Sequence, residues 1–459
     1  MKTDTIAAIA TAMAGSGIGI VRISGEEAVS ITDQIFHMPG GKKLSDMETH
    51  TIHYGHIRDG EEVIDEVMVL LMRGPRSYTR EDTVEIDCHG GVYVMKRILE
   101  TVIKYGARPA EPGEFTKRAF LNGRIDLSQA ESVIDVISAK NEFALKSSMK
   151  QLSGAVSDAV KEIREEILHE IAFIESALDD PEHISLDGYG ERLELTIEGA
   201  VDRIEKLLAS SDNGRILKEG ISTVIVGKPN AGKSSLLNTL LGEERAIVTE
   251  IAGTTRDVLE EQINLNGIIL NIIDTAGIRD TDDIVEKIGV DKARKYVKDA
   301  DLILYVVDAS TNLDENDGEI MELLHGRRTI VLLNKSDLTP LTTAEDIRVH
   351  VDKDCPVISI SAREQKGIDV FTEQIRKMFF RGEVTFNDEV YITNIRHKTA
   401  LQEALSSLHL VEQSIADGMP EDFYSIDLMN AYEVLGTIIG EAVEDDLVNE
   451  IFSKFCMGK

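Results

Sequence analysis

The stretch Gly227-Lys-Pro-Asn-Ala-Gly-Lys-Ser234 decides the fold of the central part of this chain. It follows the apolar run from Thr223 to Val226 and precedes a helical pattern, which is the order of strand, loop and helix in a phosphate-binding loop. The glycines let backbone N–H groups approach phosphates, the Lys233 ammonium reaches the β- and γ-phosphates, and the Ser234 hydroxyl is a ligand for Mg²⁺. The other loop residues expected to contact the nucleotide are Asn230, Ala231, Gly232 and Ser235.

Apolar segments alternate with helical segments from Ile221 to about Phe380. The apolar segments are 223–226, 268–273, 302–307, 329–333 and 357–360. Such alternation predicts a doubly wound sheet of parallel strands. Helical sequence flanks this region on both sides, so we expect an α/β domain, residues 216–380, inserted into a discontinuous helical domain.

The helical domain is predicted in two parts, residues 121–215 and 381–459. One apolar stripe from Val156 to Leu178 indicates a long amphipathic helix that needs packing partners, and Asp126 is expected to cap an earlier helix. Residues 1–120 instead show short β-rich runs interrupted by Gly and Pro, which predicts an α+β domain. The whole chain is therefore expected to be a multidomain α/β plus α protein.

Two further segments are expected to face the γ-phosphate and Mg²⁺. The segment Asp274-Thr-Ala-Gly277 follows an apolar strand, which places a carboxylate where it holds a metal-bound water. Gly253-Thr-Thr-Arg-Asp257 occupies the place of a switch segment, with Thr255 expected to bind Mg²⁺, although a Thr-Thr pair is also typical of a surface loop. Ile278 stands where Ras-type GTPases have glutamine, so another group must position the attacking water. The nucleotide contacts expected here are Asp274, Thr275, Ala276 and Gly277.

The segment Asn334-Lys-Ser-Asp337 identifies the base. The Asp337 carboxylate can accept hydrogen bonds from N1–H and the 2-amino group of guanine, whereas adenine has neither donor there. GTP is therefore favoured over ATP. Asn334 and Lys335 of the same segment are also expected to contact the GTP. Ser361-Ala362 follows the last strand and is expected to contact guanine O6, although alone it is an ordinary strand end.

The composition limits the kinds of partner that this chain can hold. Its 459 residues include 82 Asp and Glu against 49 Lys and Arg, a formal net charge of -33, which argues against a broad basic face for nucleic acid. Three scattered cysteines, Cys88, Cys355 and Cys456, match neither a disulfide framework nor a zinc site and favour a reducing compartment. The mildly apolar stretch Thr5 to Val21 is too short for a membrane span. We expect a cytoplasmic protein with no membrane partner.

Over its whole length the chain resembles the MnmE (TrmE) family of tRNA modification GTPases. The likeness is carried by Gly19-Ile-Val-Arg-Ile-Ser-Gly25, by Pro112-Gly-Glu-Phe-Thr-Lys-Arg-Ala-Phe120, by the order of the nucleotide motifs, and by the final Cys456-Met-Gly-Lys459. The resemblance implies a homodimer with a Ras-like GTPase domain that works with an FAD-dependent MnmG-type partner in a hetero-oligomer. Together they would place an aminomethyl or carboxymethylaminomethyl group on carbon 5 of the wobble uridine of certain tRNAs.

The resemblance also implies roles for particular residues. The N-terminal domain would dimerise and bind 5-formyltetrahydrofolate, or a related reduced folate, as one-carbon donor. The matching folate positions are Arg22, Glu81, Arg118 and Lys459. Glu286 would orient or activate water, acting with Thr255 and Lys233. K⁺ would be bound by Asn230, Thr249, Ile251 and Thr254, of which the two threonines are also counted among the GTP contacts. Cys456 is a possible nucleophile, or a small buried residue at a helix end.

Two other functions stay open at this point. A ribosome-assembly GTPase that acts as a binding switch carries similar nucleotide motifs, but such proteins usually append a basic RNA module. Here the region after Phe380 holds only the small cluster Arg396-His397-Lys398, followed by acidic helical sequence. A folate-dependent transferase with a regulatory GTPase domain is the other alternative.

Overall fold

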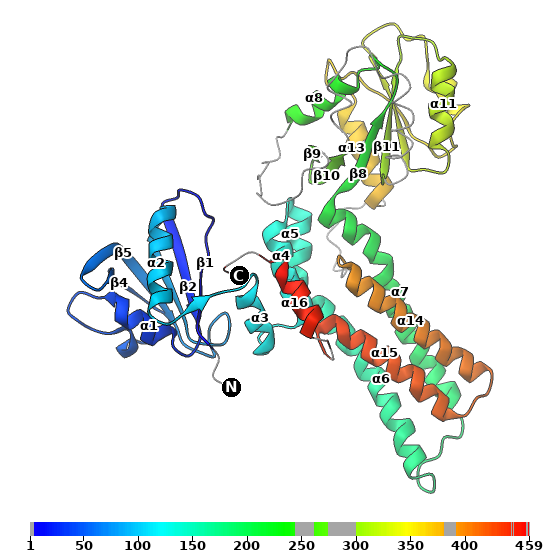
Figure 1. Cartoon of the computed structure of the whole chain (residues 1–459). Helices are drawn as coiled ribbons and strands as arrows, with labels where there is room; N and C mark the ends of the chain where they lie inside the picture. The colour runs from blue at the N-terminus through cyan, green and yellow to red at the C-terminus, as the bar shows by residue number, and fades with distance from the viewer. Residues whose placement is uncertain are drawn as a thin grey trace. The chain divides into compact units, whose positions relative to one another are not determined.

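The structure is a computed structural model that divides into two compact units (Figure 1). It describes residues 4–243, 261–273, 300–380, 392–441, 443, 445–455 and 458. The first unit comprises Met1–Ile137, Ser148–Ile204 and Thr399–Lys459, and the second comprises Ser138–Ser147 and Glu205–Lys398.

A seven-stranded sheet forms the N-terminal part of the first unit, in the order β3-β4-β5-β6-β2-β1-β7. The strands are β1 Ile6–Ile9, β2 Ile18–Ser24, β3 Phe36–His37, β4 Thr51–Asp59, β5 Glu62–Met72, β6 Thr83–His89 and β7 Arg108–Pro109. Neighbours are antiparallel except β1 and β7. In β5 the buried residues Val67, Val69 and Leu71 alternate with less buried ones, so one face is turned to the core.

Two helices, α1 (Ala28–Ile35) and α2 (Val92–Lys104), bury their apolar faces in the same core as these strands (Figure 1). The amphipathic α2 contributes Met95, Ile98 and Val102, all fully buried. Cys88 also lies in this core, and burial raises the pKa of its thiol to about 11. The predicted α+β architecture is confirmed, and Cys88 is a buried core residue rather than a reactive thiol.

The remainder of the first unit is helical and is built from both flanking parts of the sequence. Its helices are α3 Glu114–Leu121, α4 Leu127–Ser138, α6 Ala155–Asp179, α15 Glu421–Ile439 and α16 Asp445–Ser453, together with parts of α5 Glu142–Leu152, α7 Tyr189–Glu219 and α14 Ile395–Ala416. The helices α6 and α15 pack against each other although they are far apart in sequence. Arg164 of α6 donates to the Tyr432 carbonyl of α15 at 3.1 Å. The expected discontinuous helical domain is therefore present, while its exact boundaries stay predictions.

The predicted cap at the start of α4 is confirmed. The Asp126 carboxylate accepts the backbone N–H of Gln129 at 3.0 Å, and the Gln129 side chain accepts the Asp126 N–H at 3.0 Å. Two N–H groups that would otherwise lack partners at the helix start are thereby satisfied.

The second unit contains a six-stranded sheet in the order β13-β12-β11-β8-β10-β9. The strands are β8 Ile221–Val226, β9 Glu261–Leu265, β10 Ile268–Ile272, β11 Leu302–Asp308, β12 Thr329–Asn334 and β13 Val357–Ser359. One apolar layer packs with α8 (Lys233–Glu243) and α13 (Ile368–Phe380), and the opposite layer packs with α11 (Glu315–Leu324) and α12 (Ala344–Arg348). The predicted doubly wound sheet is confirmed, and β11 is buried along its full length, as a central parallel strand should be.

The expectation of parallel strands throughout is wrong for one edge of this sheet. The strand β9, which was not predicted, is antiparallel to β10. Asn266 and Gly267 between them have φ values of 51° and 89°, the left-handed pair that a two-residue hairpin requires. The Asn-Gly dipeptide was the sequence signal for this hairpin.

None of the helices in the ranges described has the length and apolarity to cross a membrane.

Candidate functional site

The phosphate-binding loop joins β8 to α8 in a conformation that only glycine permits at two positions. Gly227 has φ 150°, and a Cβ there would lie 2.3 Å from the Val306 carbonyl oxygen. Gly232 has φ 95°, and its Cβ would lie 2.2 Å from Nδ2 of Asn334. A side chain at either position would therefore displace a neighbouring strand or the base-recognition segment.

Lys233 lies within the curve of this loop. Its ammonium donates to the carbonyls of Gly227 and Lys228, both at 2.7 Å, and burial lowers its pKa. Ser234 and Ser235 follow in the first turn of α8, where the helix N-terminus favours negative charge. The lysine, the helix start and the loop backbone together form an anion site.

The predicted base-recognition residues meet beside this loop. The Asn334 side chain donates to the Ala231 carbonyl at 3.0 Å and accepts the Ala362 N–H at 3.1 Å. Asp337 is exposed and accepts a hydrogen bond from the Ser361 hydroxyl at 2.7 Å, which lowers the pKa of its carboxyl group. Asn334 thus ties the phosphate-binding loop to the segment that carries Ser361, and the ionised Asp337 carboxylate is exposed at the edge of this arrangement.

Two acidic residues that hold this arrangement were not predicted. Lys335 adopts φ 64°, and its ammonium lies 2.6 Å from Oδ2 of Asp308 at the end of β11. Burial opposes ionisation of Asp308, but hydrogen bonds from Lys335 and Ser310 outweigh it and lower the pKa. The second residue, Asp317, pairs with Lys228 of the loop at 2.6 Å. A carboxylate directly after an apolar strand was the available signal for Asp308.

The other predicted nucleotide and ion contacts lie outside the described residues. They are Thr249, Ile251, Thr254, Thr255, Asp274, Thr275, Ala276, Gly277 and Glu286. Cys456 and Lys459 lie outside them as well. Within the described ranges, no group of three His, Cys, Asp or Glu side chains is arranged to hold a metal ion.

Of the three described folate positions, Glu81 and Arg118 are paired, and Arg22 lies two residues along β2 from Ser24, which also contacts Glu81. The Arg118 guanidinium lies 3.1 Å from Oε2 of Glu81, and the Ser24 hydroxyl donates to the same oxygen at 2.9 Å. Arg22 lies 2.7 Å from Glu85 and above the Tyr78 ring at 5.4 Å. Arg22 is therefore held in a half-buried cluster, rather than lying on an exposed strand face.

Further members of this cluster were missed by the sequence reasoning. Arg118 also contacts Glu114 at 3.0 Å and Asp4 at 2.8 Å, and Arg108 pairs with both of these carboxylates. Only the spacing of Glu114 and Arg118 on α3 was a local signal. The other contacts join segments that are distant in sequence.

Gly458 contacts a member of this cluster. The Gly458 carbonyl accepts a hydrogen bond from Arg22 at 3.1 Å. Gly458 has φ 90°, and a Cβ there would lie 2.6 Å from the Ile9 carbonyl oxygen, so Gly458 lies against β1. The residue beside the predicted folate contact Lys459 is thus fixed next to Arg22.

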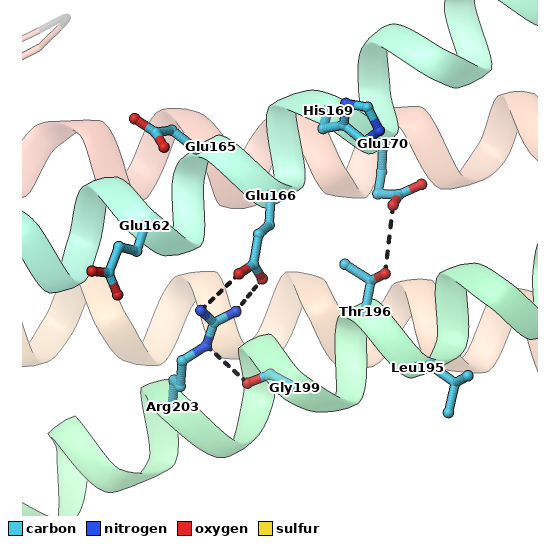
Figure 2. A pocket seen from close by; sticks show the side chains of 9 residues that line it. All are labelled: Glu162, Glu165, Glu166, His169, Glu170, Leu195, Thr196, Gly199 and Arg203. Atoms are coloured by element: carbon cyan, nitrogen blue, oxygen red, sulfur yellow. Dashed lines mark hydrogen bonds and ion pairs between the residues drawn. The ribbon is translucent and has the colours of Figure 1, made fainter.

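An open hollow of about 670 Å³ lies between α6 and α7 of the first unit (Figure 2). Figure 2 shows Arg203 turned toward Glu166, with which it forms two hydrogen bonds, and Thr196 turned toward Glu170. The acidic side chains that line this hollow are paired across the two helices or face solvent. No residue of this hollow was a predicted site residue.

Comparison with known proteins gives a consistent result over the whole chain. The family description "GTP-binding protein TrmE N-terminus" matches residues 5–124, and "MnmE helical domain" matches residues 127–456. Proteins called tRNA modification GTPase MnmE are 61% identical in Lachnoclostridium phytofermentans, over all of both chains, and 47% identical in Bacillus subtilis, over 99% of this chain and all of the relative. The solved G domain of the T. maritima FeoB iron transporter covers 35% of this chain and 98% of its own at 21% identity, with a TM-score of 0.26. The length and identity of the first two matches show that this chain belongs to the MnmE family of tRNA modification GTPases.

Proposed function

We propose that this chain hydrolyses GTP and takes part in modifying carbon 5 of the wobble uridine of tRNA. The observation that carries the proposal is the joining of Asn334, Asp337 and Ser361 to the phosphate-binding loop in a chain of this family. Family membership favours this function over a ribosome-assembly switch and over a transferase with a merely regulatory GTPase. Asp337 selects guanine, and Lys233 with the start of α8 holds the phosphates.

Mg²⁺ and K⁺ are the ions that we propose for this site. Ser234 would supply a hydroxyl ligand to Mg²⁺ with Thr255, and Asn230 would supply its side-chain oxygen to K⁺ with Thr249, Ile251 and Thr254. Asn230 adopts φ 61° inside the loop, a conformation that asparagine tolerates better than most residues. Glu286 would orient the attacking water.

The N-terminal cluster fits a reduced folate by the chemistry of its side chains. Glu81 offers a carboxylate to the N–H donors of a pterin, and Arg22, Arg118 and Lys459 offer cations to the glutamate end. The folate would supply the one-carbon unit. Cys456 would act as a nucleophile.

The proposal extends to partners, place and domain limits. The chain would form a homodimer through residues 1–120 and would join an FAD-dependent MnmG-type protein in the cytoplasm, with tRNA as substrate. The GTPase domain would span residues 216–380, between helical parts 121–215 and 381–459.

Nucleoside analysis of tRNA tests this function directly. Cells that lack the chain should carry wobble uridines without the 5-substituent, and restoring the wild-type chain should return it. Unchanged substitution in the cells that lack it would contradict the proposal.

A further inference from the structure

Three exposed arginines are carried by the loop 73–82 and by the turn 122–125 of the first unit, which contact each other through Arg80 and Asn122. They are Arg76, Arg80 and Arg124. Among the residues that the structure describes, none of the three pairs with a carboxylate. The chain has 82 acidic residues against 49 basic ones, so grouped arginines without acidic partners depart from its general surface.

Arg80 is held in place by its backbone and by a reciprocal contact. Its φ of 63° is uncommon for a residue other than glycine, and such a conformation marks a position worth a functional explanation. Its guanidinium donates to the Asn122 carbonyl at 2.9 Å, while the Asn122 side chain donates to the Thr79 carbonyl at 2.7 Å. The loop and the turn are thereby locked together, and the other guanidinium donors face solvent.

Arg124 is held by an aromatic ring. Its guanidinium lies 4.7 Å from the centre of the Tyr78 ring, and that same ring lies 5.4 Å from the guanidinium of Arg22. Tyr78 therefore connects Arg124 with Arg22 of the folate cluster. Two cations at one ring repel each other, so an anion bound beside them would be favoured.

We propose that Arg76, Arg80 and Arg124 form an arginine rim that binds phosphates of the substrate tRNA beside the Arg22, Glu81 and Arg118 cluster. This inference rests on the proposed function, because it assumes that the uridine is brought to the folate cluster. Arginine presents a planar set of donors that matches phosphate oxygens, and less conformational entropy is lost when the side chain is already held. An acidic chain can contact RNA only through such a local basic site.

The test compares tRNA binding by the full chain and by the combined variant Arg76→Gln, Arg80→Gly, Arg124→Gln. Glycine at position 80 accepts the positive φ without strain, so the fold should be retained, which a thermal melt checks. Arg192→Gln is the matched control, because Arg192 is also exposed and stacked on aromatic rings, at 4.4 Å from Phe173 and 4.9 Å from Tyr189.

Fluorescence anisotropy with labelled tRNA is measured over a range of KCl concentrations. Each lost phosphate contact should reduce the slope of log K against log salt by roughly 0.7 to 0.9. The slope for the combined variant should therefore be smaller than the wild-type slope by about two to three. Its affinity for tRNA at low salt should be about tenfold weaker. The control should match wild type. Equal slopes and affinities for wild type and the combined variant would overturn the rim, as would a wild-type chain that binds no tRNA.

A second arm separates RNA phosphates from the anionic tail of a folate. Equilibrium dialysis with a poly-γ-glutamyl reduced folate should give equal binding for wild type and the combined variant. Loss of folate binding with unchanged tRNA binding would reassign the rim to the folate tail and overturn the proposal. The proposed function is judged separately, by whether the wild-type chain restores wobble-uridine modification in cells that lack it.

Discussion

The ammonium of Lys228 lies 2.6 Å from Oδ2 of Asp317, a residue that is 1% exposed. Lys228 also lies 2.8 Å from Asp314, the N-cap of α11, and the other oxygen of Asp317 accepts the Tyr305 hydroxyl at 2.8 Å. The second residue of the phosphate-binding loop is thus tied to a buried carboxylate of the neighbouring helix α11. The loop is therefore anchored at Lys228 by this ion pair and at Ala231 by the hydrogen bond from Asn334.

Lys228→Ala should lower the free energy of unfolding on the order of 3 kcal/mol, because it leaves Asp317 buried without its cation. It should also weaken GTP binding, since the loop loses an anchor. Lys228→Arg keeps the charge and should recover most of both properties. Urea unfolding and nucleotide titration of the three proteins check this, and equal stability of the Ala variant and wild type would exclude the anchoring role.

Asp337→Asn should weaken GTP binding by roughly 1.5 to 3 kcal/mol, which is typical of a lost charged hydrogen bond. Affinity for xanthosine triphosphate should rise, because the amide N–H₂ suits a carbonyl at position 2 of the base. The exposed Asp354→Asn in the same unit is the control and should bind GTP like wild type. Unchanged base preference in the Asp337 variant would remove this residue from the base site.

Asn230→Ala should abolish the advantage of KCl over NaCl in GTP hydrolysis at equal ionic strength. A cation between the β- and γ-phosphates is worth about 10³ to 10⁵ in rate when an arginine supplies it, and K⁺ would fill that role here. GTP binding should be largely retained, because Lys233 and the loop backbone still hold the phosphates. Wild-type rates that are equal in the two salts would contradict the role of the ion.

Glu114→Gln should destabilise the first unit most at neutral pH. Burial raises the pKa of Glu114, but hydrogen bonds from Arg108, the Glu111 N–H and Arg118 outweigh it and hold that pKa below 4.5. A carboxyl group with a lowered pKa contributes stability above its ordinary pKa and loses that contribution as the pH falls through the lowered value. The difference in melting temperature between variant and wild type should therefore shrink on acidification below about pH 4.5.

Thermal melts from pH 7 to pH 3 measure this difference. Glu100→Gln, at an exposed position of α2, should match wild type at every pH. A difference for Glu114→Gln that stays constant over the whole range would show that the ion pairs are not its cause.

The nucleotide site could be predicted in outline because its chemistry is local in sequence. The loop from Gly227 to Ser234, the segment from Asn334 to Asp337 and the strand alternation each carry their own pattern, and the sheet brings the first two together. The hairpin at Asn266 and Gly267 is equally local, because its Asn-Gly dipeptide is a signal for a two-residue turn.

The supporting contacts could not be predicted in the same way. Asp317 lies on a helix far along the chain from Lys228, and only the packing of α11 brings the two within hydrogen-bond distance. Likewise, the pairing of Asp4 with Arg118 depends on the tertiary fold of the N-terminal part. Isolated charged residues carry no periodic pattern, so their partners become known only from the structure.

Reconstitution with purified components shows whether tRNA modification by this chain requires guanine recognition. The purified full chain is incubated with an MnmG-type protein, a reduced folate, an amino donor and tRNA that lacks the wobble substituent, in KCl with Mg²⁺. Mass spectrometry of the tRNA nucleosides should show conversion of the wobble uridine with GTP, and almost none with ATP or with Asp337→Asn and GTP. Equal conversion with GTP, with ATP and without nucleotide would show that the modification does not require guanine recognition by this chain.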